Sequence, residues 1–143
     1  MPPTTVTCNL AIPANTNAGG RLQGAGFGAT TPRLNGGDSL QIVVTWGGNN
    51  PPTSLNGYFI ISPVQGTNQS APSPFKNGSN YLCFQEQVAN KSGNGQQYSF
   101  QPFTVPTGAA AGSYELTIVV ENATIPPPSQ QWSEDPEFDT TGD

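Results

Sequence analysis

The sequence predicts an all-β protein, built as an antiparallel two-sheet β-sandwich of about six or seven strands. Three observations support this prediction. Apolar and polar residues alternate in several short segments, as in strands that bury one face. The 17 glycines and 15 prolines fall mostly between these segments, where turns need them. No segment of useful length shows the apolar spacing of an amphipathic helix.

The first half of the chain contains three expected strands. Thr5–Ile12 places its apolar residues at alternate positions. Ser39–Trp46 follows a turn at Asn35–Asp38 and alternates in the same way. Gly57–Ser62 is apolar at both parities, which predicts a central strand covered on both faces.

The second half adds three more expected strands, and Gly24–Arg33 is a candidate for a seventh. Tyr81–Val88 precedes Gln96–Val105, in which the apolar phase changes at Pro102. Because proline cannot donate to a ladder, we expect a bulge or a crossover between sheets there. Ser113–Asn122 then alternates without interruption.

Two strand beginnings, Gly37–Leu40 and Gly112–Leu116, resemble the sequence pattern of immunoglobulin-like and cupredoxin-like domains. The resemblance implies a sandwich of the immunoglobulin-like type, and a jelly-roll type fits the same strands. Trp46 lies 38 residues after Cys8, which is not the cysteine–tryptophan–cysteine spacing of an immunoglobulin domain. A cupredoxin copper site needs histidine, which this chain lacks.

The composition changes after residue 125, which predicts a sandwich domain over residues 1–125 and a separate segment over residues 126–143. Pro126–Pro128 is expected to form an extended spacer. Five of the nine acidic residues lie in the last ten positions, which predicts an acidic C-terminal tail.

The tail is the strongest candidate for partner docking. Two aromatic residues among carboxylates could anchor in a pocket of a partner, with charge steering around them; the six candidate residues are Trp132, Glu134, Asp135, Glu137, Phe138 and Asp139. Three alternatives stay open: a solvated tail, a calcium site built from the carboxylates, or Trp132 packed back on the sandwich.

Charge and composition exclude several classes of function. The net charge is −5, and the four basic residues are too scattered for a nucleic-acid surface. Without histidine, no imidazole metal site can form, and calcium is the one cofactor to consider. The longest candidate segment, Leu116–Val120, has five residues and is far too short for a membrane span.

The two cysteines, Cys8 and Cys83, form either a disulfide or two buried thiols. No signal peptide is recognisable at the N-terminus. The low charge content favours an extracellular or surface-associated protein, with a cytoplasmic one as the alternative. Four Asn-x-Ser/Thr triplets, which begin at Asn68, Asn77, Asn90 and Asn122, are candidate glycosylation sites.

We therefore expect a non-catalytic structural or interaction module that meets a protein partner, or its own copies, through edges and loops. The first alternative is a carbohydrate- or other ligand-binding module, with or without calcium, in which aromatic faces contact the glycan; the candidates are Trp46, Tyr58, Tyr81 and Tyr98. The second alternative is an enzyme without histidine, for which the sandwich offers the carboxylates of Asp38, Glu86, Glu115 and Glu121.

Overall fold

The computed structural model describes residues 3–13, 19–28, 30–48, 51–64, 76–77, 80–81, 83–89, 97–108, 111–122 and 130–141. All regular structure within these stretches is β-strand. In the same stretches there is no helix with the length and apolar character that a membrane crossing requires.

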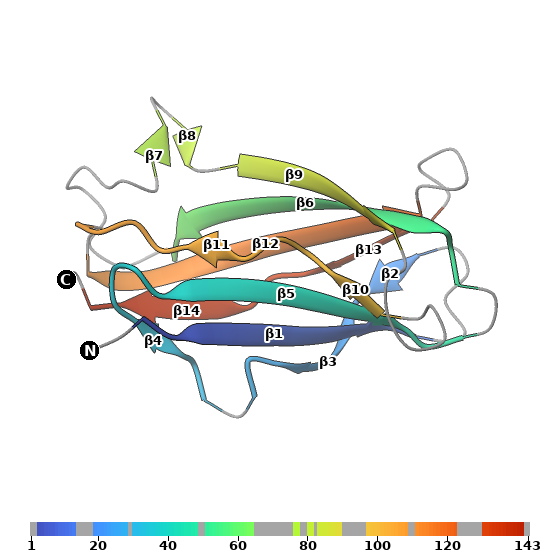
Figure 1. Ribbon diagram of the computed structural model, residues 1–143, viewed down its shortest axis with the longest axis horizontal. Helices are drawn as coiled ribbons and strands as arrows, with labels where there is room; N and C mark the ends of the chain where they lie inside the picture. The colour runs from blue at the N-terminus through green and yellow to red at the C-terminus, as the bar shows by residue number, and fades with distance from the viewer. Residues whose placement is uncertain are drawn as a thin grey trace.

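The predicted β-sandwich is confirmed: two sheets face each other and enclose one core (Figure 1). The first sheet consists of β1 (Thr5–Ile12), β3 (Gln23–Gly26), β5 (Ser39–Trp46), β10 (Gln97–Ser99) and β11 (Phe103–Thr104). The second sheet consists of β2 (Gly20–Arg21), β4 (Arg33–Leu34), β6 (Ser54–Pro63), β9 (Cys83–Ala89), β12 (Gly112–Asn122), β13 (Gln131–Glu134) and β14 (Glu137–Thr140). A short ribbon pairs β7 (Lys76–Asn77) with β8 (Asn80–Tyr81).

The sheets are mixed, so the prediction of a purely antiparallel sandwich is wrong. Strands β1 and β5 pair in parallel over their whole length, and β2 and β4 run parallel to β13 and β14. Parallel neighbours need a long connection between them. Between β1 and β5 lie three short strands: β2 and β4 pair with the second sheet, and β3 pairs with the first.

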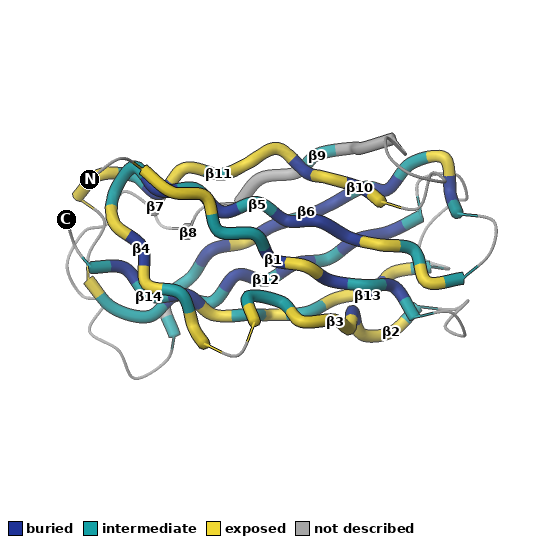
Figure 2. Tube along the Cα trace, turned by 60° about the horizontal axis from the view of Figure 1, so that its bottom comes forward, coloured by how far each residue is buried: buried dark blue, intermediate teal, exposed yellow. Residues whose placement is uncertain are grey.

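The core is formed by the faces that alternation predicted to be inward. In β5 and β12 the buried residues include Leu40, Ile42, Val44, Tyr114, Leu116, Ile118 and Val120, as the dark blue segments of Figure 2 show. Rings from the two sheets meet across this core: Phe59 and Phe100 pack edge to face, with ring centroids 5.2 Å apart. Such pairs add attraction beyond the area that they bury.

Strand β6 does not have the double cover that its sequence predicted. Phe59 is 1% exposed, whereas Ile60 is 41% exposed, so only one face is buried. β6 is central within its sheet, between β12 and β9, but no other described layer packs on its outer face. Its apolar run therefore reflected a central position in the sheet and not burial from both sides.

The phase change at Pro102 is a β-bulge, one of the two outcomes expected. Ser99 pairs with Val43 and Phe103 with Leu40, so four steps on one strand match three on the other. Because of the extra residue, Phe100 and Val105 both face the core, although one has an even number and the other an odd number. Both β10 and β11 stay on β5, which rules out a crossover there.

The C-terminal segment is part of the sandwich, so the predicted boundary after residue 125 does not hold for residues 130–141. Strands β13 and β14 pair with β12 in one continuous register, and Leu116 N–H donates to the Pro136 carbonyl between them. Polar composition misled the prediction, since an edge strand buries only every second residue. The expected spacer at residues 126–128 lies outside the described residues.

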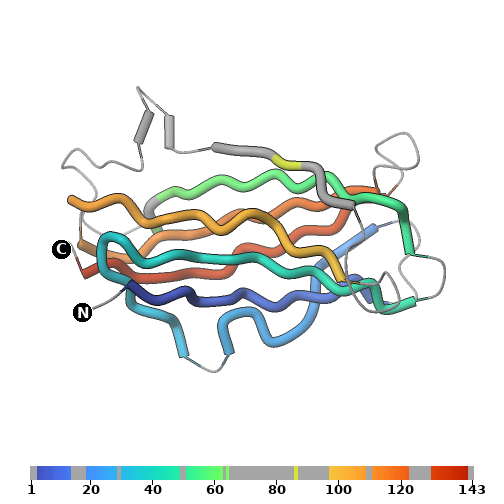
Figure 3. Tube along the Cα trace, in the orientation of Figure 1, coloured from blue at the N-terminus to red at the C-terminus, as the bar shows by residue number. Residues whose placement is uncertain are grey.

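Residues 19–28 and 30–34 run along the edges of the two sheets (Figure 3). β2 lies on β13, β3 crosses to β1, and β4 returns to β14. The single strand expected at Gly24–Arg33 is therefore replaced by two shorter ones on different sheets. Glycines with positive φ, such as Gly24 at 109° and Gly28 at 93°, permit this path.

The predicted turn at Asn35–Asp38 forms hydrogen bonds with residues near both ends of the described chain. The Asp38 carboxylate accepts from the N–H groups of Thr4 and Asn35, each at 2.9 Å. The Thr141 hydroxyl bonds to the Asn35 side chain at 2.7 Å. The two N–H bonds hold the pKa of Asp38 below its ordinary value.

Candidate functional site

The two aromatic residues predicted to anchor a partner are buried in the protein's own core. Trp132 is 1% exposed and meets Trp46 edge to face, with ring centroids 5.6 Å apart. Phe138 is 0% exposed and stacks on Tyr114. The prediction that they reach a partner is wrong, and the alternative in which Trp132 packs back on the sandwich is confirmed.

The four acidic residues predicted to join them point in different directions. Glu134 pairs with Arg21, while Asp139 accepts a hydrogen bond from the Ser113 hydroxyl at 2.6 Å. Asp135 and Glu137 are exposed. Among the described residues no three carboxylate or thiol side chains gather closely enough to hold a metal ion. The calcium alternative therefore finds no ligand set there.

The disulfide between Cys8 and Cys83 is not formed in this structure. Cys8 is a buried free thiol in β1, within the first sheet, whereas Cys83 begins β9 at the edge of the second. Burial raises the pKa of the Cys8 thiol to about 12, with a smaller contribution from Glu134. Cys8 accordingly matches the alternative of a buried thiol that packs as a small apolar side chain.

The proposed glycan-contacting aromatics do not form one surface. Tyr98 is buried and its hydroxyl donates to the Pro52 carbonyl, and Trp46 is half-buried against Trp132. Tyr58 lies on the outer face of the second sheet, where its hydroxyl donates to Glu121 at 2.8 Å. The side chain of Tyr81 lies outside the described part of the chain.

The uncovered part of a sheet edge is a better candidate. β2 pairs with Trp132 and Ser133, and β4 pairs with Asp139 and Thr140. Among the described residues, no strand pairs with the edge of residues 134–138 that lies between these two contacts. This stretch, which we call the edge gap, spans roughly 17 Å at about 3.3 Å per residue.

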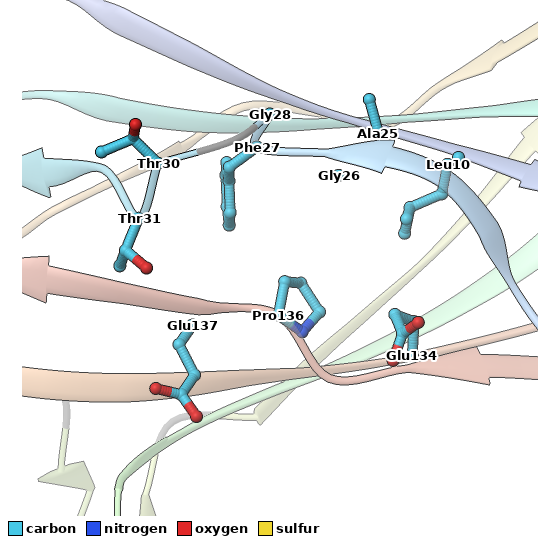
Figure 4. A pocket seen from close by; sticks show the side chains of 11 residues that line it. Leu10, Ala25, Gly26, Phe27, Gly28, Thr30, Thr31, Glu134, Pro136 and Glu137 are labelled. Carbon is cyan, nitrogen blue, oxygen red and sulfur yellow. The ribbon is translucent and has the colours of Figure 1, made fainter.

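A pocket with a volume of about 290 Å³ lies beside the edge gap. Its lining combines glycines, hydroxyls, one ring and two carboxylates; the residues are Leu10, Gly24, Ala25, Gly26, Phe27, Gly28, Thr30, Thr31, Glu134, Pro136 and Glu137. We call it the edge pocket. Figure 4 shows the side chains of Leu10 and Phe27 pointing toward Pro136, whereas the Glu137 carboxylate points away from the glycine segment.

Residues 24–28, the glycine segment, form one wall of the edge pocket, and glycine stands at every second position of this segment, where φ is positive. Gly24, Gly26 and Gly28 all have positive φ, and a Cβ at Gly24 would stand 3.0 Å from the Asn9 carbonyl oxygen. The wall therefore presents backbone at its three glycines and side chains at Ala25 and Phe27. Phe27, which is half-buried, supplies the one ring.

Glu134 lies between the edge pocket and a smaller pocket of about 210 Å³ that is also lined by Arg21 and Asp135. Its Oε1 atom accepts from the Arg21 guanidinium and from the Asp135 N–H. Within the described part of the chain, its Oε2 atom has no hydrogen-bond partner. One carboxylate oxygen of Glu134 thus remains able to accept a donor from a ligand.

Sequence reasoning singled out Glu134 and Glu137 but missed the opposite wall. Gly24–Gly28 read as loop or weak strand, and nothing in it indicated that it would face the C-terminal strands. The one available signal was glycine at every second position, Gly24, Gly26 and Gly28, which indicates a backbone with unusual φ.

Comparisons with protein-family models, with curated proteins and with solved structures found no match to this chain. The function must therefore be argued from the site alone.

Proposed function

We propose that the chain is a non-catalytic interaction module that binds its partner at the edge gap and the edge pocket. The observation that carries the proposal is the interruption of strand pairing at residues 134–138, directly beside a pocket of about 290 Å³. An edge with unpaired backbone groups is a template for a further strand, and the adjacent pocket can select a side chain.

The chemistry of the pocket favours binding over catalysis. Glu134 and Glu137 both border it, but the Glu137 side chain points away from the shared space in Figure 4. Paired-carboxylate hydrolysis needs two carboxyl groups that face one substrate bond. The low charge content agrees with a module on a cell surface or outside the cell, which is part of this proposal.

Carbohydrate binding is the second candidate function, and the Phe27 ring beside Thr30 and Thr31 favours it. An aromatic face and hydroxyl groups are common components of sugar sites. Against it, the site has one ring, and that ring is phenylalanine without a polar atom.

The proposal is tested with three assays on the full chain. A random peptide library and a glycan array with and without chelator search for ligands, and sedimentation velocity over a concentration series detects self-association. Each assay compares Thr31→Trp, which fills the edge pocket, with Thr45→Trp, which places the same side chain on the exposed outer face of β5.

We expect at least one assay to show binding that Thr31→Trp weakens tenfold or more and Thr45→Trp leaves unchanged. Absence of binding in all three assays, or binding that both variants retain, would contradict the proposal.

A further inference from the structure

We propose that the occupant of the edge gap is an extended peptide segment of a partner protein that carries a basic side chain. This inference rests on the function proposed above and specifies the class of partner. The segment lies parallel to β13 and β14, as β2 and β4 do on either side of the gap.

The backbone of the edge gap has groups available for such a strand. Leu22 N–H donates to Ser133 and Asp139 N–H donates to Pro32 on the outer side of this edge, while Pro136 accepts from Leu116 on the inner side. Backbone groups alternate along a strand, so the N–H and C=O of Glu137 point outward like those of Ser133 and Asp139. No described residue pairs with them there.

The remaining groups of the gap limit how the segment can bind. The Asp135 N–H is occupied by Glu134, at 3.0 Å, and Pro136 has no N–H. The Asp135 carbonyl and both groups of Glu137 are therefore the backbone contacts on offer. These few hydrogen bonds fit a short segment, and they leave side-chain recognition to the edge pocket.

Charge selects a basic side chain. Glu134 lines the edge pocket, and Asp135 and Glu137 add two further negative charges along the edge gap. Two positive charges stand against these three: Arg21, which contacts Glu134 and Asp135, and Arg33, which lies in β4 beyond the other end of the gap. Arg21 itself shows that a guanidinium fits against Glu134, whose Oε2 atom still lacks a described partner. The nearby Phe27 ring lines the same pocket and can favour a cation over its face.

The peptide accounts for more of the site than a neutral glycan does. A glycan can use Phe27 and the threonine hydroxyls, but it has no use for unpaired strand groups in a five-residue gap or for an excess of negative charge. We therefore keep the glycan as an outcome of the experiment.

The test uses ¹⁵N-labelled full-length protein and a blocked pentapeptide of alternating threonine and valine with arginine at its centre. The matched peptide has citrulline, the neutral analogue of arginine, at the same place, and a maltooligosaccharide is the glycan probe. Titrations follow amide resonances and yield a Kd for each ligand.

We expect the arginine peptide to shift the amide resonances of residues 24–28, 134, 135, 137 and 138, and the citrulline peptide to bind at least tenfold more weakly. Glu134→Gln should weaken the arginine peptide threefold or more, and Glu137→Gln, which removes a carboxylate that borders the pocket but points away from it, should weaken it by a smaller factor. Glu86→Gln removes the same charge from β9, at the opposite edge of the sheet, and should leave the Kd unchanged. Glu137→Gln keeps the test valid if loss of the Arg21 ion pair destabilises the Glu134 variant.

Equal binding of the two peptides, shifts outside these residues, or no shifts at all would overturn the basic-peptide inference. Shifts of the same residues by the maltooligosaccharide alone would also overturn it while leaving the proposed function in place. If ligands sensitive to Thr31→Trp are absent as well, the proposed function fails too.

Discussion

Glu121 is the most constrained titratable residue on the outer face of the second sheet, where it is only 5% exposed. Its carboxylate accepts hydrogen bonds from Gln131 at 3.0 Å, Tyr58 at 2.8 Å and Asn56 at 3.2 Å. These bonds, that from Gln131 first, hold the pKa of Glu121 below its ordinary value of 4.5, although burial opposes the shift. The hydrogen bond from Tyr58 to Glu121 raises the pKa of the Tyr58 hydroxyl.

Glu121→Gln should lower the free energy of unfolding by about 1–3 kcal/mol at neutral pH, because a Gln side chain cannot accept from all three donors. A lowered folded pKa stabilises the protein above the unfolded pKa, and this contribution is lost as pH falls through the folded value. Urea unfolding from pH 7 to pH 3 should therefore show a difference in the free energy of unfolding between parent and variant that becomes smaller in acid. A difference that stays constant with pH would contradict a lowered pKa for Glu121.

Cys8 should be inert to thiol reagents in the folded protein, because its pKa of about 12 leaves almost no thiolate at neutral pH and its side chain is buried. The measurement is the rate of reaction with a disulfide reagent in a Cys83→Ser variant, which isolates this thiol. Denaturant should accelerate the reaction strongly. Fast modification of the native protein would show that Cys8 is accessible.

Short strands at the edges, rather than the long central ones, shape the candidate site. β3 pairs with β1 at Asn9 and Ala11, with an irregular register between them, and this holds the glycine segment over the edge pocket. Among Gly24, Gly26 and Gly28, Gly24 has the least space, since a Cβ there would meet the backbone of β1. Gly26 has open space around its Cβ position and a φ of 60°.

Gly24→Ala should therefore destabilise the protein more than Gly26→Ala. The first substitution adds a backbone clash to an unfavourable φ, whereas the second costs about 1–2 kcal/mol for a left-handed alanine. Thermal unfolding gives the comparison directly, and hydrogen exchange of β1 amides should rise only in the Gly24 variant. Equal melting temperatures would show that β3 is not packed as described.

At the scale of the whole molecule, the C-terminal strands are structural. Trp132 and Phe138 are among the largest fully buried side chains, and each contacts a ring of another strand. The turn at Asn35–Asp38 further joins Thr4 at one described end of the chain to Thr141 at the other. We therefore expect residues 130–141 to be needed for folding.

Trp132→Ala or Phe138→Ala should each cost about 3–5 kcal/mol of stability, as large-to-small core substitutions do. Truncation after residue 125 should leave an unfolded or aggregating chain. Circular dichroism and denaturant titration check both statements, with Thr45→Ala on an exposed face as a control that loses little. If the truncated chain unfolds cooperatively, residues 126–143 are a tail that the sandwich does not need, as the sequence predicted.

Local alternation predicted much of the core but little of the site. The inward faces of β1, β5 and β12 follow from the alternation of apolar and polar residues. The bulge near Pro102 is one of the two outcomes that a break in this alternation predicted. Parity carries no information about which strands become neighbours or what covers an outer face. That is why Ile60 was expected to be buried and why the acidic strands beside Trp132 were expected to be a tail.

The sequence by itself determined that this chain forms a two-layered β-structure and which side chains turn toward its interior, because these follow from a two-residue period that each strand carries alone. Only the tertiary structure decided the parallel pairing of β1 with β5, the free thiol of Cys8 and the edge gap beside Glu134. Those features depend on contacts between residues far apart in the chain, which a period carried within each strand does not specify.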